Sequence, residues 1–325
     1  MRALLLLLTP LLLTACLPPA IAFDPANTPS PQALGPNNAA TEWWYVSGYL
    51  PETGQAFHWA QFKVNYNGLP YYASHIAVTD LNSGKLTFLD ERRQDAAFTF
   101  PPLKVRQADW SLTQTASAPT APFVLNAGPL QLTLTPQKGP VVHPPGYSGT
   151  AEVGRLYYQS ITRLGIAGKP ASGTAWFDHQ WGDQTPGRAA LWDWFGVHLS
   201  DGSDLMLYRV KTLGGKVVQL AGSEVGADGV AREVRGVTMT PTREWTSPSG
   251  RRYVLDWTVA SERGSLTLKA VRDDQELIAK STSVAYWEGP VSGAGTWGGA
   301  AVQVYGMGEF VGGALTRAEG GLFGE

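Results

Sequence analysis

The chain has 325 residues, and its 25 Lys and Arg against 27 Asp and Glu give a net charge of −2. Nucleic-acid-binding domains carry a basic field, so this balance argues against a nucleic-acid partner. Twelve Trp and twelve Tyr accompany 37 Gly and 23 Pro. This mixture of large aromatics and turn-forming residues favours short strands over helices.

The N-terminus is typical of an export signal. Arg2 precedes the apolar run 4–13, which is too short to span a bilayer. The following "LTAC" resembles a bacterial lipobox ending at Cys16, the only cysteine of the chain. An ordinary secretory signal with an incidental cysteine is the alternative. We expect a lipoprotein signal peptide over 1–16 and an extracytoplasmic protein, anchored to the inner or outer membrane of the cell envelope through lipidated Cys16.

Residues 17–40 are rich in Pro, Ala and Asn and predict a flexible tether. Strand-like segments begin at 42–50 and 55–66 and recur to the end of the chain with turn residues between them. No long stretch has a helical period. The pattern predicts an all-β sandwich or antiparallel barrel.

Two parts of the chain resemble each other at an offset of about 150 residues. Trp44-Tyr45 aligns with Trp194-Phe195, and the turn at Gly54 aligns with the turn at Gly202. This repeat predicts two similar domains, over 41–167 and 168–325. The aromatic residues either fill the two cores or line a cavity for an apolar ligand.

The segment "GTAWFDHQWG" contains the first candidate site. In a strand, Phe177, His179 and Trp181 would share one face, and Trp176 and Asp178 the other. A histidine among aromatics can act as a general acid or base, because its pKa lies near neutrality. It can equally be a core histidine with satisfied hydrogen bonds.

Asp193 lies between two tryptophans and is a second candidate acid, since apolar surroundings raise the pKa of a carboxyl group. An outward-facing aspartate on a barrel rim is the alternative. The five histidines have no metal-ligand spacing, so no metal site is predicted. The acidic residues are too scattered to suggest a paired-carboxylate site.

Several segments, in this order, resemble the AttH/CrtC family: "EWWYVSGYL", "SHIAVTD", "GTAWFDHQWG", "WDWFGVHLSDGSDLMLYRV" and "YWEG". The family includes carotenoid 1,2-hydratases and AttH-like proteins described as secreted hydrolases. The resemblance covers about residues 40–312 and implies two packed lipocalin-like antiparallel β-barrels. It also implies a possible ABC transporter permease as a partner.

The resemblance further implies a chemistry. A hydratase protonates the terminal double bond of an isoprenoid, water adds to the resulting carbocation, and no cofactor is needed. His179 and Trp181 match a His-x-Trp pair of the family, and Tyr208 matches a tyrosine on a later strand. Gln180 stands where many relatives have Glu, and Arg209 or Val210 stands where the hydratases carry an acid. Asp178 or Asp193 would then supply the proton.

These observations predict one function and leave two alternatives. We expect a membrane-anchored lipoprotein that binds an apolar isoprenoid or lipid-like ligand, as a carrier or accessory of an envelope ABC transporter. The alternative is a hydratase-type or hydrolase-type enzyme that uses acid–base chemistry around His179 and Trp181; a purely structural envelope protein is a third possibility. The candidate catalytic residues are His179, Trp181, Asp178, Asp193 and Tyr208, and the candidate ligand contacts are Trp44, His75, Trp176, Trp192 and Trp194.

Overall fold

The computed structural model describes residues 23–66, 69–184 and 190–319, so Cys16 and the predicted signal peptide lie outside the described residues. Regular structure in the described part is β apart from one short 3₁₀ segment, η2 (Arg317–Glu319). No helix there is long and apolar enough to cross a membrane. The all-β prediction is confirmed.

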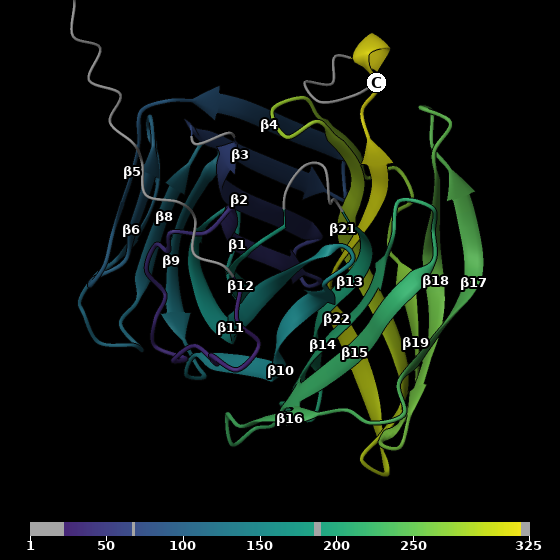
Figure 1. The fold of residues 1–325 in the computed structure, drawn as a ribbon. Coiled ribbons are helices and arrows are strands. Elements are labelled where there is room, and N and C mark those ends of the chain that lie inside the picture. The colour runs from purple at the N-terminus through teal and green to yellow at the C-terminus, as the bar shows by residue number, and fades with distance from the viewer. Residues whose placement is uncertain (1–22, 67–68, 185–189, 320–325) are drawn as a thin grey trace, which may run out of the picture.

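The first sheet is antiparallel and curls into a nearly closed barrel (Figure 1). Its strands follow the order β4-β3-β2-β1-β12-β11-β9-β8-β7-β6-β5, and β10 pairs beside this path with β11. The strands are β1 (Thr41–Leu50), β2 (Gln55–Tyr66), β3 (Leu69–Asp80), β4 (Lys85–Arg93), β5 (Ala96–Thr99), β6 (Lys104–Gln107), β7 (Trp110–Gln114), β8 (Phe123–Ala127), β9 (Leu130–Pro136), β10 (Val141–Thr150), β11 (Gly154–Lys169) and β12 (Gly173–Gly182).

The second sheet is more open and follows the order β16-β15-β14-β13-β22-β21-β19-β18-β17, with β20 beside β21 (Figure 1). Its strands are β13 (Leu191–Leu199), β14 (Asp204–Lys211), β15 (Val217–Val225), β16 (Ala231–Glu233), β17 (Thr238–Thr246), β18 (Arg252–Ser261), β19 (Gly264–Ala270), β20 (Glu276–Ala279), β21 (Val284–Trp297) and β22 (Ala300–Ala314).

The two sheets repeat one topology. In each, the first strand pairs with both the second and the last strand, and one strand, β10 or β20, lies off the main path. This repetition bears out the predicted pair of lipocalin-like domains. The chain changes sheet between β12 and β13, whereas the predicted domain limit at 167/168 falls inside β11. Strand β12 follows that limit and returns to pair with β1, which joins strands β1–β4 to the rest of the first sheet.

The repeat is shifted by one residue from the alignment suggested by the sequence. Trp44 lies in the interior core of the first sheet, and Phe195 lies in that of the second. Trp194, the expected equivalent of Trp44, instead faces the space between the sheets. A shift of one residue moves a side chain to the opposite face because strand side chains alternate.

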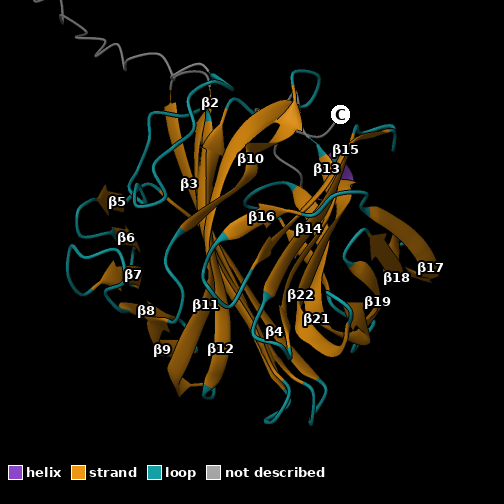
Figure 2. Ribbon diagram, turned by 90° about the horizontal axis from the view of Figure 1, so that it is seen from below, coloured by secondary structure: helices purple, strands orange, loops and turns teal. Residues whose placement is uncertain are grey.

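A third core lies between the two sheets. It contains Tyr45, Trp176, Trp194 and Met307, with smaller residues around them. Strands β1 and β2 contact β21 and β22 across this layer. Figure 2 shows the sheets side by side from another direction. The outer faces of both barrels are therefore buried where they meet.

The described part of the predicted tether, residues 23–40, is held against the first sheet. Leu34 is 1% exposed within the interior core. Its carbonyl accepts a hydrogen bond of 2.9 Å from the indole of Trp44, and the side chain of Gln159 donates to the carbonyl of Ala33 at 2.6 Å. An apolar side chain that reaches the core fixes this segment despite its proline-rich composition.

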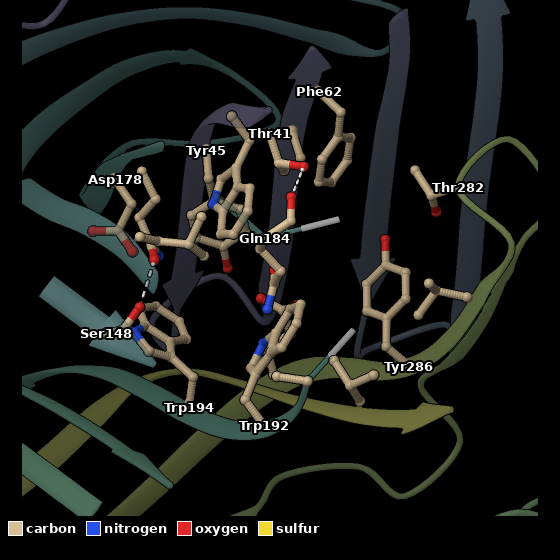
Figure 3. Close-up of a pocket in the computed structure, with 18 of the residues that line it drawn as sticks. Thr41, Tyr45, Phe62, Ser148, Asp178, Gln184, Trp192, Trp194, Thr282 and Tyr286 are labelled. Atoms are coloured by element: carbon tan, nitrogen blue, oxygen red, sulfur yellow. Dashed lines mark hydrogen bonds between the residues drawn. The ribbon is translucent and has the colours of Figure 1, made fainter. Parts of the chain in front are cut away.

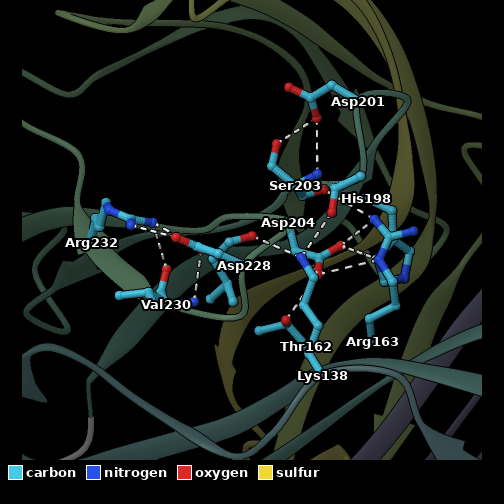
Figure 4. Close-up of polar contacts among 12 residues, drawn as sticks. Lys138, Thr162, Arg163, His198, Asp201, Ser203, Asp204, Asp228, Val230 and Arg232 are labelled. Carbon is cyan, nitrogen blue, oxygen red and sulfur yellow. Dashed lines mark hydrogen bonds and ion pairs between the residues drawn. The ribbon is translucent and has the colours of Figure 1, made fainter.

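A buried ion cluster joins the sheets (Figure 4). The carboxylate of Asp204 on β14 lies 2.5 Å from Arg163 and 2.7 Å from Lys138, and it accepts a hydrogen bond of 2.9 Å from Thr162. His198 lies 2.7 Å away. Burial alone would raise the pKa of Asp204, but the hydrogen bond and charge of His198 and the charge of Arg163 outweigh burial and lower it. Asp204 is therefore a carboxylate matched by cations from the other sheet.

Candidate active site

A cavity of about 230 Å³ lies between the two sheets. Strands β1–β3, β11 and β12 line one side, and β13, β14, β21 and β22 line the other (Figure 3). Most of the wall is aromatic or aliphatic. The described lining contains no Lys or Arg. Its central aromatic residues are Trp43, Tyr45, Tyr158, Trp192, Trp194 and Tyr286.

Three carboxyl groups reach this cavity: those of Asp178 on β12, Glu288 on β21 and Glu309 on β22. Glu288 and Glu309 are direct partners across the β21–β22 pair. Side chains of directly opposed residues share a face of the sheet and start about 5 Å apart. The two glutamates therefore form a close pair of like groups.

The glutamate pair holds protons tightly. Burial, followed by the charge of Glu309, raises the pKa of Glu288 well above its ordinary value. Burial raises the pKa of Glu309 to about 8, although a hydrogen bond from Trp192 works against the rise. One oxygen of Glu288 accepts a hydrogen bond of 2.5 Å from Tyr45, and the other has no partner among the described residues. The pair therefore carries a proton at neutral pH.

Asp178 is poised closer to neutrality. Burial raises its pKa to about 7, while hydrogen bonds from Ser160, Trp176 and Tyr158 lower it. The hydroxyl of Tyr158 donates at 2.8 Å and the indole of Trp176 at 2.6 Å. Trp194 in turn donates to the oxygen of Tyr158 at 2.6 Å. A carboxyl group with this pKa can give or take a proton under physiological conditions.

Histidines and a tyrosine form the polar wall on the other side of the cavity. Nδ1 of His75 lies 2.9 Å from the hydroxyl of Tyr286, and its Nε2 lies 3.1 Å from Ser281. Burial, followed by the charge of His75, lowers the pKa of His58 to about 3. His58 is therefore neutral and supplies no positive charge to the carboxyl groups.

The cavity brings together five of the predicted site residues: Asp178, His75, Trp192, Trp194 and Tyr208. Trp192 stacks on Trp43, with ring centroids 6.3 Å apart. The hydroxyl of Tyr208 donates to the carbonyl of Tyr147 at 3.3 Å, and burial raises its pKa. Trp176 lies behind the wall, where its indole bonds to Asp178.

His179 and Trp181 lie on the opposite face of β12, as the strand alternation predicts, and neither lines the cavity. His179 is fully buried and stacks between Trp44 and Trp181, with ring centroids 4.9 and 4.5 Å away. Its ring nitrogens lie 2.9 Å from Glu42 and 2.9 Å from Gln159. Burial outweighs the effect of Glu42 and lowers the pKa of His179. These contacts describe a neutral core histidine with both nitrogens satisfied.

Asp193 also lies away from the cavity, and its surroundings differ from those expected. Its carboxylate forms ion pairs of 2.8 Å with Arg209 and 2.8 Å with Lys211. Arg209 is its cross-strand partner on β14 and also covers the ring of Trp257. Two cations pair with this carboxylate, so the structure does not provide the apolar setting expected for Asp193.

The glutamate pair was missed in the sequence, although a signal for it is present. Gly298 and Gly299 have φ values of 59° and 84° and form a two-residue turn between β21 and β22. Such a turn fixes the register of a hairpin. Glu288 lies nine residues before Trp297, and Glu309 lies nine residues after its partner Ala300. The turn alone therefore predicts that the two glutamates face each other.

The described residues contain no group of three or more His, Cys, Asp or Glu side chains that could hold a metal ion.

This fold and cavity define a two-barrel, lipocalin-like protein with a buried acidic site between the barrels. The chain belongs to the AttH-like family, whose model matches residues 24–313. The family resemblance seen in the sequence is thereby confirmed.

Solved structures share the fold. A crystal structure of an AttH from Nitrosomonas europaea is 24% identical, covers 91% of this chain and 100% of its own, and superposes with a TM-score of 0.73. Kievitone hydratase from Nectria haematococca is 16% identical over 87% of this chain and 92% of its own, with a TM-score of 0.66. CghA with Sch210972 is 13% identical over 93% and 96%, with a TM-score of 0.62. No protein of curated function matches the sequence.

Proposed function

We propose that the protein is a cofactor-independent hydratase that adds water to a carbon–carbon double bond of an apolar, isoprenoid-like substrate bound between the barrels. The observation that carries this proposal is the group of three carboxyls with raised pKa in an aromatic cavity whose described lining has no Lys or Arg. Membership of the AttH-like family and the fold shared with kievitone hydratase support it.

Glu309 is the acid in this proposal. It is partly exposed and lines the cavity, and its pKa of about 8 keeps it protonated at neutral pH. Transfer of its proton to one alkene carbon forms a C–H bond and breaks the π bond. The other carbon becomes a tertiary carbocation. The charge of Asp178 adds to burial in raising the pKa of Glu309 and so keeps the proton available in the resting site.

The remaining groups stabilise the cation and complete the addition. The faces of Trp43, Trp192 and Trp194 can stabilise positive charge, and no described lysine or arginine of the wall opposes it. Water adds to the cation and its surplus proton passes to Asp178, whose pKa near 7 suits a base. Return of that proton to Glu309 restores the starting state.

The envelope location is part of the proposal. Lipidation at Cys16 would hold the enzyme at a membrane outside the cytoplasm, where apolar substrates are dissolved. A carrier that serves an ABC transporter permease is the competing function. A carrier needs the aromatic cavity but has no use for protonated carboxyl groups at its base.

The test uses the purified full chain with detergent-dispersed lycopene or squalene in ¹⁸O-labelled water, and mass spectrometry of the products. We expect a tertiary alcohol that carries one ¹⁸O atom. Glu309→Gln should lower kcat by about 100-fold or more, because removal of a general acid has effects of this size. Glu224→Gln, which changes a carboxylate paired with Arg263 outside the cavity, should leave kcat unchanged. Binding without any turnover by the unsubstituted protein would favour the carrier.

A further inference from the structure

The cavity reaches one particular end of the molecule. Strand pairing brings four strand ends to the same level: the start of β1, the ends of β2 and β12, and the start of β11. Thr41 pairs with Val64 and with Gly182, and Gly182 pairs with Leu156. In the second sheet, Leu191 at the start of β13 pairs with the end of β14. The cavity is lined at this level by Thr41, Val64, Leu156, Gln184, Ala190 and Val210. We call this the mouth end; Figure 2 shows β2, β10 and β15 toward it.

The cavity wall changes character with depth. On β21, Val284 lies nearer the mouth end than Glu288, and on β22, Val311 lies nearer than Glu309. Val64, Leu156 and Val210 continue this apolar surface around the opening. The carboxyl groups lie deeper. A ligand therefore passes an apolar throat before it reaches them, which suits a molecule that arrives from an apolar phase.

Exposed apolar side chains surround the same end. Leu69 at the start of β3 is 70% exposed, Leu213 in the β14–β15 turn 60%, and Val217 at the start of β15 46%. Lys216, in the same turn, is exposed and lies 3.6 Å from Glu152. Apolar side chains beside an exposed lysine are suited to the headgroup region of a bilayer.

The N-terminal segment reaches the same end. The ring of Phe23 lies 4.4 Å from that of Tyr157 and 5.3 Å from that of Tyr147. Tyr147 directly precedes Ser148, which lines the cavity. Seven peptide steps lead from Cys16 to Phe23, and at ~3.5 Å each they span no more than ~25 Å. An anchor at Cys16 would therefore keep the mouth end close to the membrane.

We infer that the mouth end rests on the surface of a lipid bilayer and that the cavity takes its ligand directly from the bilayer. The ligand class rests on the proposed function. The orientation rests on the anchor at Cys16 from that proposal, together with the position of Phe23, the opening and the exposed side chains, but it does not rest on the hydration reaction. The orientation can therefore be tested without any turnover.

The test uses the full chain, extracted in detergent and reconstituted on vesicles of phosphatidylethanolamine and phosphatidylglycerol. An NBD fluorophore is attached through Val217→Cys or, as the matched control, through Val230→Cys. Val230 is similarly exposed, at 49%, but follows the far end of β15. Unsubstituted protein treated with the same reagent measures any label on Cys16.

Lipids with nitroxide groups near the headgroup should quench the label at position 217 several-fold more than the label at position 230. Equal quenching at the two positions, or stronger quenching at position 230, would overturn the inferred orientation, as would a protein that stays off the vesicles. If the orientation is found but no substrate is hydrated, the proposed hydratase function fails and the membrane-facing mouth stands.

Discussion

Replacing Glu309 with glutamine should remove activity and stabilise the protein at the same time. The pKa of Glu309 is about 8, against an ordinary value of 4.5. Because the pKa of Glu309 is raised in the folded state, its protonated side chain makes its whole contribution to the free energy of unfolding below pH 4.5. That contribution is lost as pH rises toward 8. At ~1.4 kcal/mol per unit, the loss is about 3 kcal/mol at pH 7 and about 5 kcal/mol above pH 8. A glutamine side chain at this position does not titrate and avoids this loss.

Urea denaturation followed by tryptophan fluorescence at pH 5, 7 and 8.5 measures the effect. The difference between Glu309→Gln and the unsubstituted protein should be small at pH 5 and should grow with pH, because only the unsubstituted protein has to ionise Glu309. Loss of that charge also eases ionisation of Glu288, which changes the difference in the same direction. Glu224→Gln is the control and should show no such growth. Parallel curves for Glu309→Gln and the unsubstituted protein would refute the argument that Glu309 is kept protonated by its surroundings.

Three further predictions concern other buried groups. Asp204→Asn should lower the free energy of unfolding by ~3–5 kcal/mol, because it leaves Lys138 and Arg163 without their shared anion; an unchanged urea midpoint would contradict this. His179→Gln should lower stability by ~1–3 kcal/mol through lost hydrogen bonds but keep kcat; a lost kcat in a folded variant would return this residue to the site. The pKa of His143 is lowered by burial to about 3, so its contribution to stability should fall by ~2 kcal/mol between pH 6.5 and pH 5, as the unfolded state takes up a proton; His143→Gln should remove that part of the pH dependence, and an unaltered dependence would count against it.

The strand patterns of the sequence were sufficient to predict the all-β class and the repeated domain. They could not show which face of β12 lines the cavity between the sheets. Asp178 and His179 do point in opposite directions, as alternation requires. Both faces of the strand are buried, however, one inside the first barrel and the other between the barrels. Aromatic residues occupy both faces, so local sequence does not distinguish the core histidine from the cavity carboxyl.

The other site residues depend on contacts between distant strands. Asp193 looked like an isolated acid, but the β13–β14 register places Arg209 opposite it. Asp178 acquires its pKa near neutrality from burial by the second sheet, against hydrogen bonds from Ser160 and Tyr158 on β11. The glutamate pair is the exception, because the two-residue glycine turn between β21 and β22 fixes the register that places Glu288 opposite Glu309.

A ligand-bound crystal structure tests the central claim most directly. The protein should be crystallised with the tertiary alcohol expected from hydration of an acyclic isoprenoid. We expect the hydroxyl to lie within hydrogen-bonding distance of Asp178, Glu288 or Glu309, with the hydrocarbon chain directed along the aromatic wall to the mouth end. A ligand inside the first barrel beside Trp44 and His179, with the cavity between the sheets empty, would contradict the claim.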